Sequence, residues 1–176
     1  MKNTKQLTET AIAVALAAVL AFIPLYRMPQ GGDVSLTMIP LLLIAFRRGP
    51  VSGIAAGAVY GLISMAINGV IYHPMSILLD YVLAFGVLGI AGFFKKNLTG
   101  IICGTIAGVG GRFLSSYLSG AVLFASYAPE GQSPWIYSLI YQATYLIPEL
   151  IICLAVLVLL FVKAHKVFEV KINKGY

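Results

Sequence analysis

The lysine and arginine residues of this chain fall into alternate gaps between its long apolar runs. Ten of the twelve precede the first run or follow the second, fourth and sixth runs: Lys2, Lys5, Arg47, Arg48, Lys95, Lys96, Lys163, Lys166, Lys171 and Lys174. Of the other two, Arg27 lies in a gap of the opposite set and Arg112 lies within the fifth run. Loops rich in Lys and Arg stay on the cytoplasmic side of a membrane. The alternation therefore predicts six spans, with the N and C termini both cytoplasmic.

The composition supports a membrane protein. Of the 176 residues, 60% are hydrophobic and only 10% are charged, whereas soluble domains carry about 25% charged residues. A water-soluble core of this size cannot hide so much apolar surface. We therefore expect an all-α integral membrane protein in which residues 1–176 form a single transmembrane domain in the cell membrane.

Several classes of function are disfavoured by what the chain lacks. The net charge of +6 is explained by membrane topology, so we expect no nucleic-acid partner. Cys103 and Cys153 lie in apolar runs without metal-ligand spacing. No nucleotide-binding loop and no hydrolase or metalloprotease motif is present. We expect no enzymatic activity, no catalytic residues, no cofactor and no metal.

The boundaries of the six spans follow from the apolar runs. We expect them over Thr10–Leu25, Val34–Phe46, Pro50–Asn68, Pro74–Phe94, Leu98–Phe124 and Pro134–Val162. The second is too short to cross lipid alone, because its helix would rise only about 20 Å against a hydrocarbon core of about 30 Å. We expect it to begin deeper or to be extended by Met28–Asp33 folding back, and Pro40 to kink it. Pro148 and Glu149 are expected to interrupt the sixth span.

Small residues recur at helical spacing in two of the spans. In the first, one set is Ala11, Ala15 and Ala18, and the other is Ala13, Ala17 and Ala21. Small side chains on one face let another helix approach closely. From the residues alone, packing within the bundle is favoured, and docking to a partner subunit is the second interpretation. Gly53, Gly57 and Gly61 form a similar seam in the third span.

Three ionisable residues lie within apolar runs, where each needs a partner or a function. Arg112 and Glu149 are near the middle of the fifth and sixth spans, and an internal ion pair between them is the structural interpretation. Asp80 lies nearer the outer end of the fourth span, next to Tyr81. Aromatic residues gather at these outer ends, together with Ser116 and Gln142. A carboxylate surrounded by aromatic rings suits a cationic heteroaromatic ligand.

An ordered set of short motifs carries a family resemblance. It comprises Ile39–Gly49, Gly57-x-x-x-Gly61-Leu62, Leu79-Asp80-Tyr81, Gly89-x-Ala91-Gly92, Gly111-Arg112-Phe113, Ser119–Gly131, Tyr137-Ser138-Leu139-x-Tyr141 and Pro148-Glu149. In this order, over nearly the whole chain, the set resembles the thiamine-specific S-components of energy-coupling factor transporters. The resemblance implies a six-helix protein of the bacterial plasma membrane that binds its vitamin near the extracellular face. It also implies association with a transmembrane coupling subunit and two ATPase subunits.

The resemblance assigns roles to individual residues. Ala11 and Ala15 match the family's Ala-x-x-x-Ala docking motif, which favours the partner interpretation for that face. The family's ligand-binding positions fall on Asp80, Tyr81, Gly120 and Tyr137. Three positions depart from it: Ser116 replaces a histidine, Gln142 replaces an asparagine, and the tryptophan of the first loop has no counterpart near Gly31. The aromatic residue of loop five is Phe124. The predicted substrate-binding residues are Asp80, Tyr81, Ser116, Gly120, Phe124, Trp135, Tyr137 and Gln142.

The leading hypothesis is therefore a high-affinity vitamin-binding S-component, for thiamine or a closely related compound, with the Arg27–Asp33 loop as a lid. One alternative is an S-component for another vitamin, such as pyridoxine or a hydroxymethylpyrimidine. A second is a self-sufficient proton-coupled transporter that uses Asp80, Arg112 and Glu149 as a relay. Against it, the chain shows no inverted repeat for rocking halves. A third is a purely structural membrane subunit.

Overall fold

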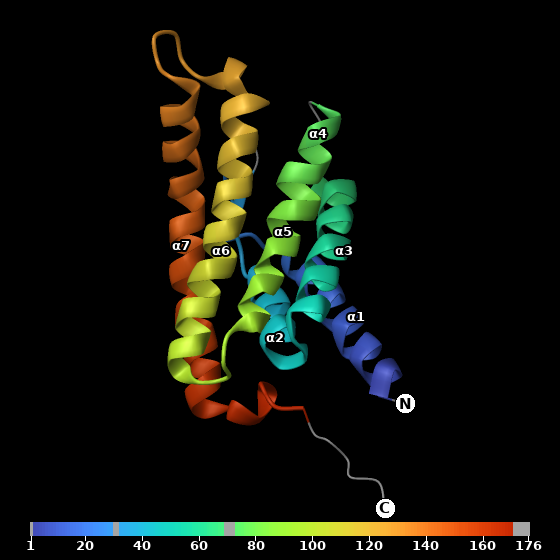
Figure 1. Cartoon of the computed structure of the whole chain (residues 1–176). Coiled ribbons are helices and arrows are strands. Elements are labelled where there is room, and N and C mark those ends of the chain that lie inside the picture. The colour runs from blue at the N-terminus through green and yellow to red at the C-terminus, as the bar shows by residue number, and fades with distance from the viewer. Residues whose placement is uncertain (1, 30–31, 69–72, 171–176) are drawn as a thin grey trace, which may run out of the picture.

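A computed structural model of the chain describes residues 2–29, 32–68 and 73–170, and in these ranges the fold is almost entirely helical. Gly31, Lys171 and Lys174, which entered the sequence argument, lie outside the described residues. The start of α1 and the segment after α7 lie at the same end of the helix bundle as the α2–α3 turn, as the topology requires (Figure 1).

The principal helices follow the six predicted runs. They are α1 (Lys2–Leu20), α2 (Met38–Arg48), α3 (Pro50–Asn68), a composite helix over residues 74–93, α6 (Leu98–Val122) and α7 (Pro134–Lys163). The composite helix consists of α4 (Pro74–Ser76), the π-helix η1 (Ile77–Leu83), α5 (Ala84–Gly86) and the 3₁₀ helix η2 (Val87–Phe93). Short elements complete the fold: β1 (Tyr26–Arg27), β2 (Asp33–Val34), and the 3₁₀ turns η3 (Ala125–Tyr127) and η4 (His165–Val167).

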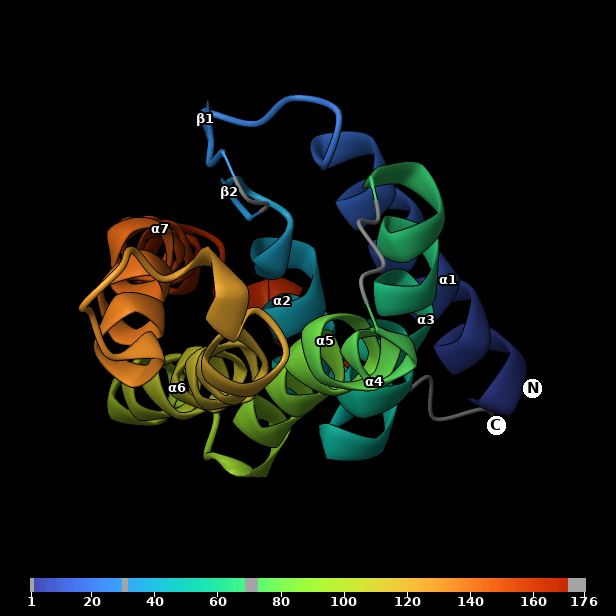
Figure 2. The ribbon, with the colours of Figure 1, turned by 90° about the horizontal axis from the view of Figure 1, so that it is seen from above.

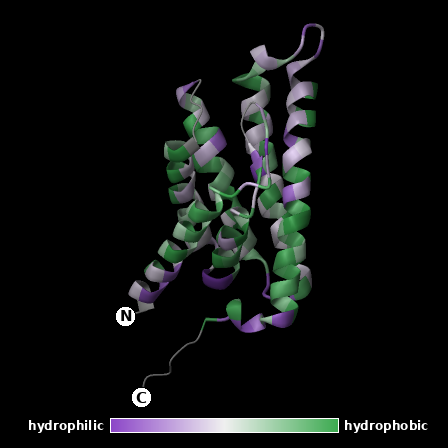
Figure 3. Ribbon diagram, turned by 180° about the vertical axis from the view of Figure 1, so that it is seen from behind, coloured by the Kyte–Doolittle hydropathy of each residue, from purple (hydrophilic) through white to green (hydrophobic). Residues whose placement is uncertain are grey.

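Four of these segments are long and apolar enough to cross a membrane: α3, the composite helix, α6 and α7. Large apolar side chains on their outer surfaces are exposed, such as Leu114 at 60%, Ile151 at 61% and Val162 at 69%. Exposure on this scale is unfavourable in water and favourable in lipid. Figure 3 shows hydrophobic residues along the helices and strongly hydrophilic ones at the loop between α6 and α7 and near the two chain ends.

Several of the expected boundaries and helix breaks differ in the structure; α1, for example, begins at Lys2 rather than Thr10. α1 ends at Leu20 rather than Leu25, and α2 begins at Met38 rather than Val34. The residues between them form the β1–β2 hairpin, which is the folding back that the short second span required. Pro40 does not kink α2, because it lies in the first turn, where its missing N–H has no intrahelical partner to lose. α7 is one continuous helix through Pro148, which is exposed; transmembrane helices tolerate internal proline in this way.

The glycine seam of α3 explains how the composite helix packs so closely. A Cβ on Gly57 would overlap the backbone carbonyl of Phe85, and one on Gly61 would overlap that of Tyr81. Glycine is therefore required at both positions for the two backbones to touch. This contact fixes Tyr81 and its neighbour Asp80 relative to α3.

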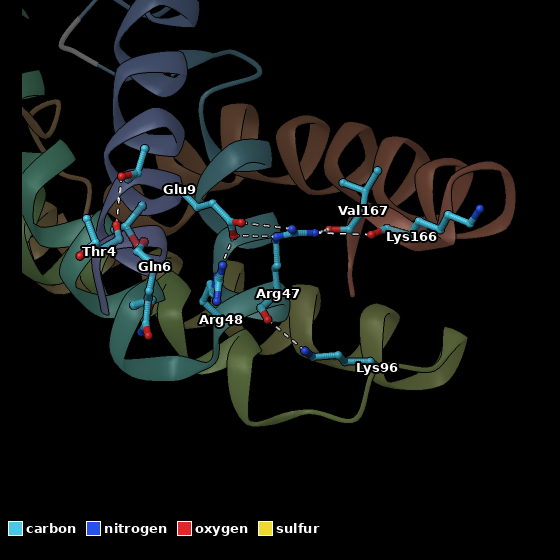
Figure 4. A network of polar contacts seen from close by, with 11 residues as sticks. Thr4, Gln6, Glu9, Arg47, Arg48, Lys96, Lys166 and Val167 are labelled. Carbon is cyan, nitrogen blue, oxygen red and sulfur yellow. Dashed lines mark hydrogen bonds and ion pairs between the residues drawn. The ribbon is translucent and has the colours of Figure 1, made fainter. Parts of the chain in front are cut away.

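The cytoplasmic end of the bundle is held by a polar cluster (Figure 4). Glu9 of α1 accepts from Arg47 Nε at 2.8 Å and from Arg48 Nε at 2.7 Å, and Arg47 Nη1 also donates to the carbonyl of Val167 at 2.7 Å. The two guanidinium groups lower the pKa of Glu9 from 4.5 to about 2. Next to Val167, Phe168 is completely buried. The cluster joins α1, α2 and the segment after α7.

Candidate functional site

A cavity of about 400 Å³ opens between the β1–β2 hairpin, α3, η1, α6 and α7. Its volume lies within the range of about 300–1,000 Å³ that is usual for small-molecule sites. Its walls come from the start of the composite helix, the second half of α6 and the first half of α7. These parts lie toward the end of the bundle opposite the start of α1 and the α2–α3 turn (Figure 1). The lysine and arginine pattern places that end on the outer side of the membrane.

Seven of the eight predicted substrate-binding residues line this cavity: Asp80, Tyr81, Ser116, Gly120, Phe124, Tyr137 and Gln142. The eighth, Trp135, is not among the lining residues. Its side chain is 46% exposed, and its ring lies 5.7 Å from that of Tyr117, centroid to centroid. By helical spacing Trp135 lies on the same side of α7 as Ser138, which does line the cavity. It is in the first turn of the helix, however, and its ring packs beside Tyr117 of α6.

Asp80 is held at the cavity wall by local structure that the sequence pattern does not predict. It lies in the middle of the π-helix η1, a rare geometry that is frequent at functional sites. Its Oδ2 accepts a hydrogen bond from Ser119 Oγ at 2.7 Å, and Ser119 is fully buried in α6. Within the described ranges, no basic side chain forms an ion pair with Asp80. The carboxylate is therefore oriented by a neutral donor and keeps its negative charge uncompensated.

The wall formed by α6 and α7 is organised by Gln142. Its side-chain Nε2 donates to the carbonyl of Ser116 at 3.2 Å, and its Oε1 accepts from the hydroxyl of Tyr145. One turn earlier, Ser138 Oγ donates to the carbonyl of Tyr117 at 2.9 Å. Both polar ends of the amide are thereby held, so Gln142 presents a fixed surface to the cavity rather than a mobile arm.

Deeper in the bundle, Arg112 and Glu149 form the ion pair that the sequence suggested, with Arg112 Nη1 3.2 Å from Glu149 Oε2. Glu149 is fully buried, and Arg112 is 6% exposed and lines the cavity. The guanidinium carbon of Arg112 lies 4.3 Å from the centroid of the Phe85 ring. The other carboxylate oxygen of Glu149 accepts from Ser35 Oγ at 3.1 Å. A buried charge needs such partners to be tolerated.

The β1–β2 hairpin closes one side of the cavity and contributes Arg27, Met28, Gly32 and Asp33 to its lining. In the strand pair, Arg27 lies opposite Asp33. Figure 2 shows the hairpin above α2 and beside α7. Gly32 has φ +87°, and a Cβ there would lie 2.9 Å from the Tyr145 ring. Glycine thus lets the hairpin rest directly on an aromatic wall.

The lining also includes residues that sequence reasoning did not assign to the site, among them Tyr60, Ser64, Phe85 and Ser138. Tyr60 and Ser64 are one helical turn apart in α3, and polar groups at this spacing within an apolar span were the available signal. Phe85 had no such signal. Its edge-on contact with Tyr60, at 4.7 Å between centroids, depends on the packing of α3 against α5.

The two alanine sets of α1 face in different directions. Ala13, Ala17 and Ala21 are buried, whereas Ala11 and Ala15 are exposed beside Ile12, which is 61% exposed. No group of His, Cys, Asp or Glu side chains that could hold a metal occurs in the described part of the chain.

Comparison with known proteins gives consistent results. The family model described as "Thiamine transporter protein" matches residues 7–169. The thiamine transporter ThiT of Bacillus subtilis (strain 168) is 39% identical over 188 residues, which cover 96% of this chain and 98% of that protein. ThiT of Lacticaseibacillus paracasei is 28% identical over 196 residues, covering 100% of this chain and 98% of the relative.

Two solved structures share the fold. That of ThiT from Listeria monocytogenes superposes with a TM-score of 0.87 at 26% identity, covering 97% of this chain and all of the other. The structure described as the S component of a bacterial ECF transporter gives a TM-score of 0.67 at 23% identity, covering 93% and 97% of the two chains. The second likeness concerns the fold alone.

Proposed function

Because this chain belongs to the thiamine transporter protein family, whose model matches residues 7–169, we propose that it binds thiamine in the cavity beside Asp80 and delivers it as the S-component of an energy-coupling factor importer. It is a multi-pass protein of the cell membrane and a transport protein rather than an enzyme. The observation that carries the ligand assignment is the unpaired carboxylate of Asp80 in a cavity rich in tyrosine.

The charges that line the cavity support a cationic ligand. The lining contains four charged residues: Arg27, Asp33, Asp80 and Arg112. Arg27 lies opposite Asp33 in the hairpin, and Arg112 is paired with Glu149. Together with Glu149, these charged groups sum to one net negative charge, and Asp80 forms no ion pair within the described residues. Thiamine carries one permanent positive charge, on its thiazolium ring, so it would balance the net negative charge of the cavity.

The remaining lining supports a ligand with two aromatic rings and a polar edge. Tyr81, Tyr137 and Phe124 offer ring faces for stacking and for cation–π attraction. Ser116 and Gln142 offer hydrogen-bonding groups for the aminopyrimidine. In this arrangement Gly120 leaves room on α6, since a Cβ there would lie 3.2 Å from Gln142 Nε2. The hairpin serves as the lid.

For transport, we propose that Ala11 and Ala15 form the docking surface for a transmembrane coupling subunit that is powered by two ATPase subunits. Both alanines are exposed on α1, where small side chains permit close helix–helix contact. The alternative of a self-sufficient proton-coupled transporter is weakened because Arg112 and Glu149 are bound to each other, with Ser35 on the second carboxylate oxygen.

Calorimetric titration of the purified protein with thiamine, pyridoxine and 4-amino-5-hydroxymethyl-2-methylpyrimidine tests the ligand. We expect thiamine to bind with submicromolar affinity and the two uncharged ligands at least about a hundredfold more weakly, because neither engages Asp80 as a cation. Tighter binding of pyridoxine or of the pyrimidine would move the assignment to another vitamin. Uptake by cells that express this chain without coupling subunits, abolished by an uncoupler, would favour the proton-coupled alternative.

A further inference from the structure

Glu149 does not line the cavity, yet it determines the charge that the cavity presents. Its side chain is fully buried behind Arg112, which does line the cavity. The 3.2 Å contact between Arg112 Nη1 and Glu149 Oε2 is the ion pair that offsets the arginine's charge. Without it, the cavity walls would carry a positive group that opposes Asp80.

We propose that Glu149 is a specificity-determining positioning residue that makes the cavity selective for a monocation. By neutralising Arg112, it leaves the described charged groups at the cavity with one net negative charge and Asp80 without an ion-pair partner. This inference rests on the proposed function and extends it, because it names a residue outside the lining that sets the charge preference.

The geometry holds Arg112 in place on two sides. One Nη is tied to Glu149, and the face of the guanidinium lies 4.3 Å from the Phe85 ring centroid. Arg112 Nε is buried without a hydrogen-bond partner, so Glu149 provides the principal polar contact of this side chain. Removing the charge of Glu149 therefore leaves a buried cation without its ion-pair partner. Asp33 is then a negative charge beyond ion-pair distance, and the field of Arg112 extends into the cavity.

Glu149 also anchors the root of the hairpin. Its Oε1 accepts from Ser35 Oγ at 3.1 Å, and Ser35 Oγ lies 2.8 Å from Thr37 Oγ1. Ser35 directly follows β2. The same carboxylate thus fixes both a wall of the cavity and the segment that leads from the lid into α2. A purely structural role would predict that its loss weakens all ligands alike, whereas the charge role predicts a difference between cationic and neutral ligands.

The test compares thiamine with 3-deazathiamine, a nearly isosteric analogue whose thiophene ring carries no charge. In Glu149→Gln the affinity for thiamine should fall at least about tenfold more than the affinity for the analogue, as expected for an uncompensated charge several ångströms away. Arg112→Gln should instead raise the ratio of the affinity for thiamine to the affinity for the analogue. The double variant Arg112→Gln/Glu149→Gln should restore the ratio of the unmodified protein.

Glu130→Gln is the matched control, because Glu130 is exposed and does not line the cavity; its ratio should stay unchanged. Equal losses for both ligands in Glu149→Gln would overturn the inference, as would a double variant with the ratio of the Glu149 single variant. If Glu149→Gln does not fold, Arg112→Gln decides the inference. A fall in the ratio of thiamine affinity to analogue affinity overturns the inference, and a rise supports it. Failure of the unmodified protein to bind thiamine would instead reject the proposed function.

Discussion

Replacing Asp80 by asparagine removes the charge that defines the site while keeping the shape of the side chain. Ser119 Oγ, now 2.7 Å from the Asp80 carboxylate, can still donate to the asparagine carbonyl oxygen. The π-helix and the cavity should therefore persist. What is lost is the attraction between one negative charge and the cationic ring of the ligand.

The size of the loss follows from the half-buried position of Asp80. Two unit charges about 5 Å apart at an effective dielectric constant of about 20 attract by about 3 kcal/mol. Part of this is offset because binding removes water from the carboxylate. A net loss of about 2 kcal/mol in binding free energy corresponds to a roughly thirtyfold larger dissociation constant.

Calorimetric titration with thiamine measures this directly, and Asp80→Glu is the matched control because it retains the charge. We expect the glutamate variant to keep most of the affinity and the asparagine variant to lose about thirtyfold. Thermal unfolding in detergent checks that both variants fold. If the two variants bind equally, or if asparagine binds as well as aspartate, Asp80 is not the counter-charge and the electrostatic reasoning fails.

Three further outcomes are expected. Gly120→Ala should weaken thiamine binding at least about tenfold, because the new Cβ displaces Ser138 at the cavity wall; unchanged calorimetric affinity would contradict this. Gly57→Ala should lower the unfolding temperature by several degrees, since its Cβ overlaps the carbonyl of Phe85; an unchanged melting curve would show that the helices separate freely. The pKa of Glu9, lowered to about 2 by two arginines, implies stability that is present above pH 4.5 and lost as pH falls toward 2, so Glu9→Gln should lose less stability than the unmodified protein between these pH values; parallel melting curves would refute this.

The sequence alone determined the class of the protein, its topology and most of its site. Lysine and arginine placement acts during insertion, independently of how the helices later pack, so it could be interpreted before any contact was known. Asp80, Arg112 and Glu149 stood out because ionisable groups in apolar runs are costly wherever the fold places them. Even the pairing of Arg112 with Glu149 could be proposed, since each was the other's nearest candidate by depth.

Tertiary structure alone decided which residues face the cavity and how they are held. The π-helix around Asp80, the hydrogen bond from Ser119 and the contact between Gly32 and Tyr145 join segments far apart in the chain. Trp135 shows the same limit: its aromatic character suggested a ligand contact, but its ring packs beside Tyr117 and lies outside the cavity lining. Helical periodicity relates residues along one helix, whereas the direction of each helix face depends on packing against its neighbours. Composition and spacing can therefore name the groups of a site, while only packing brings them around one cavity.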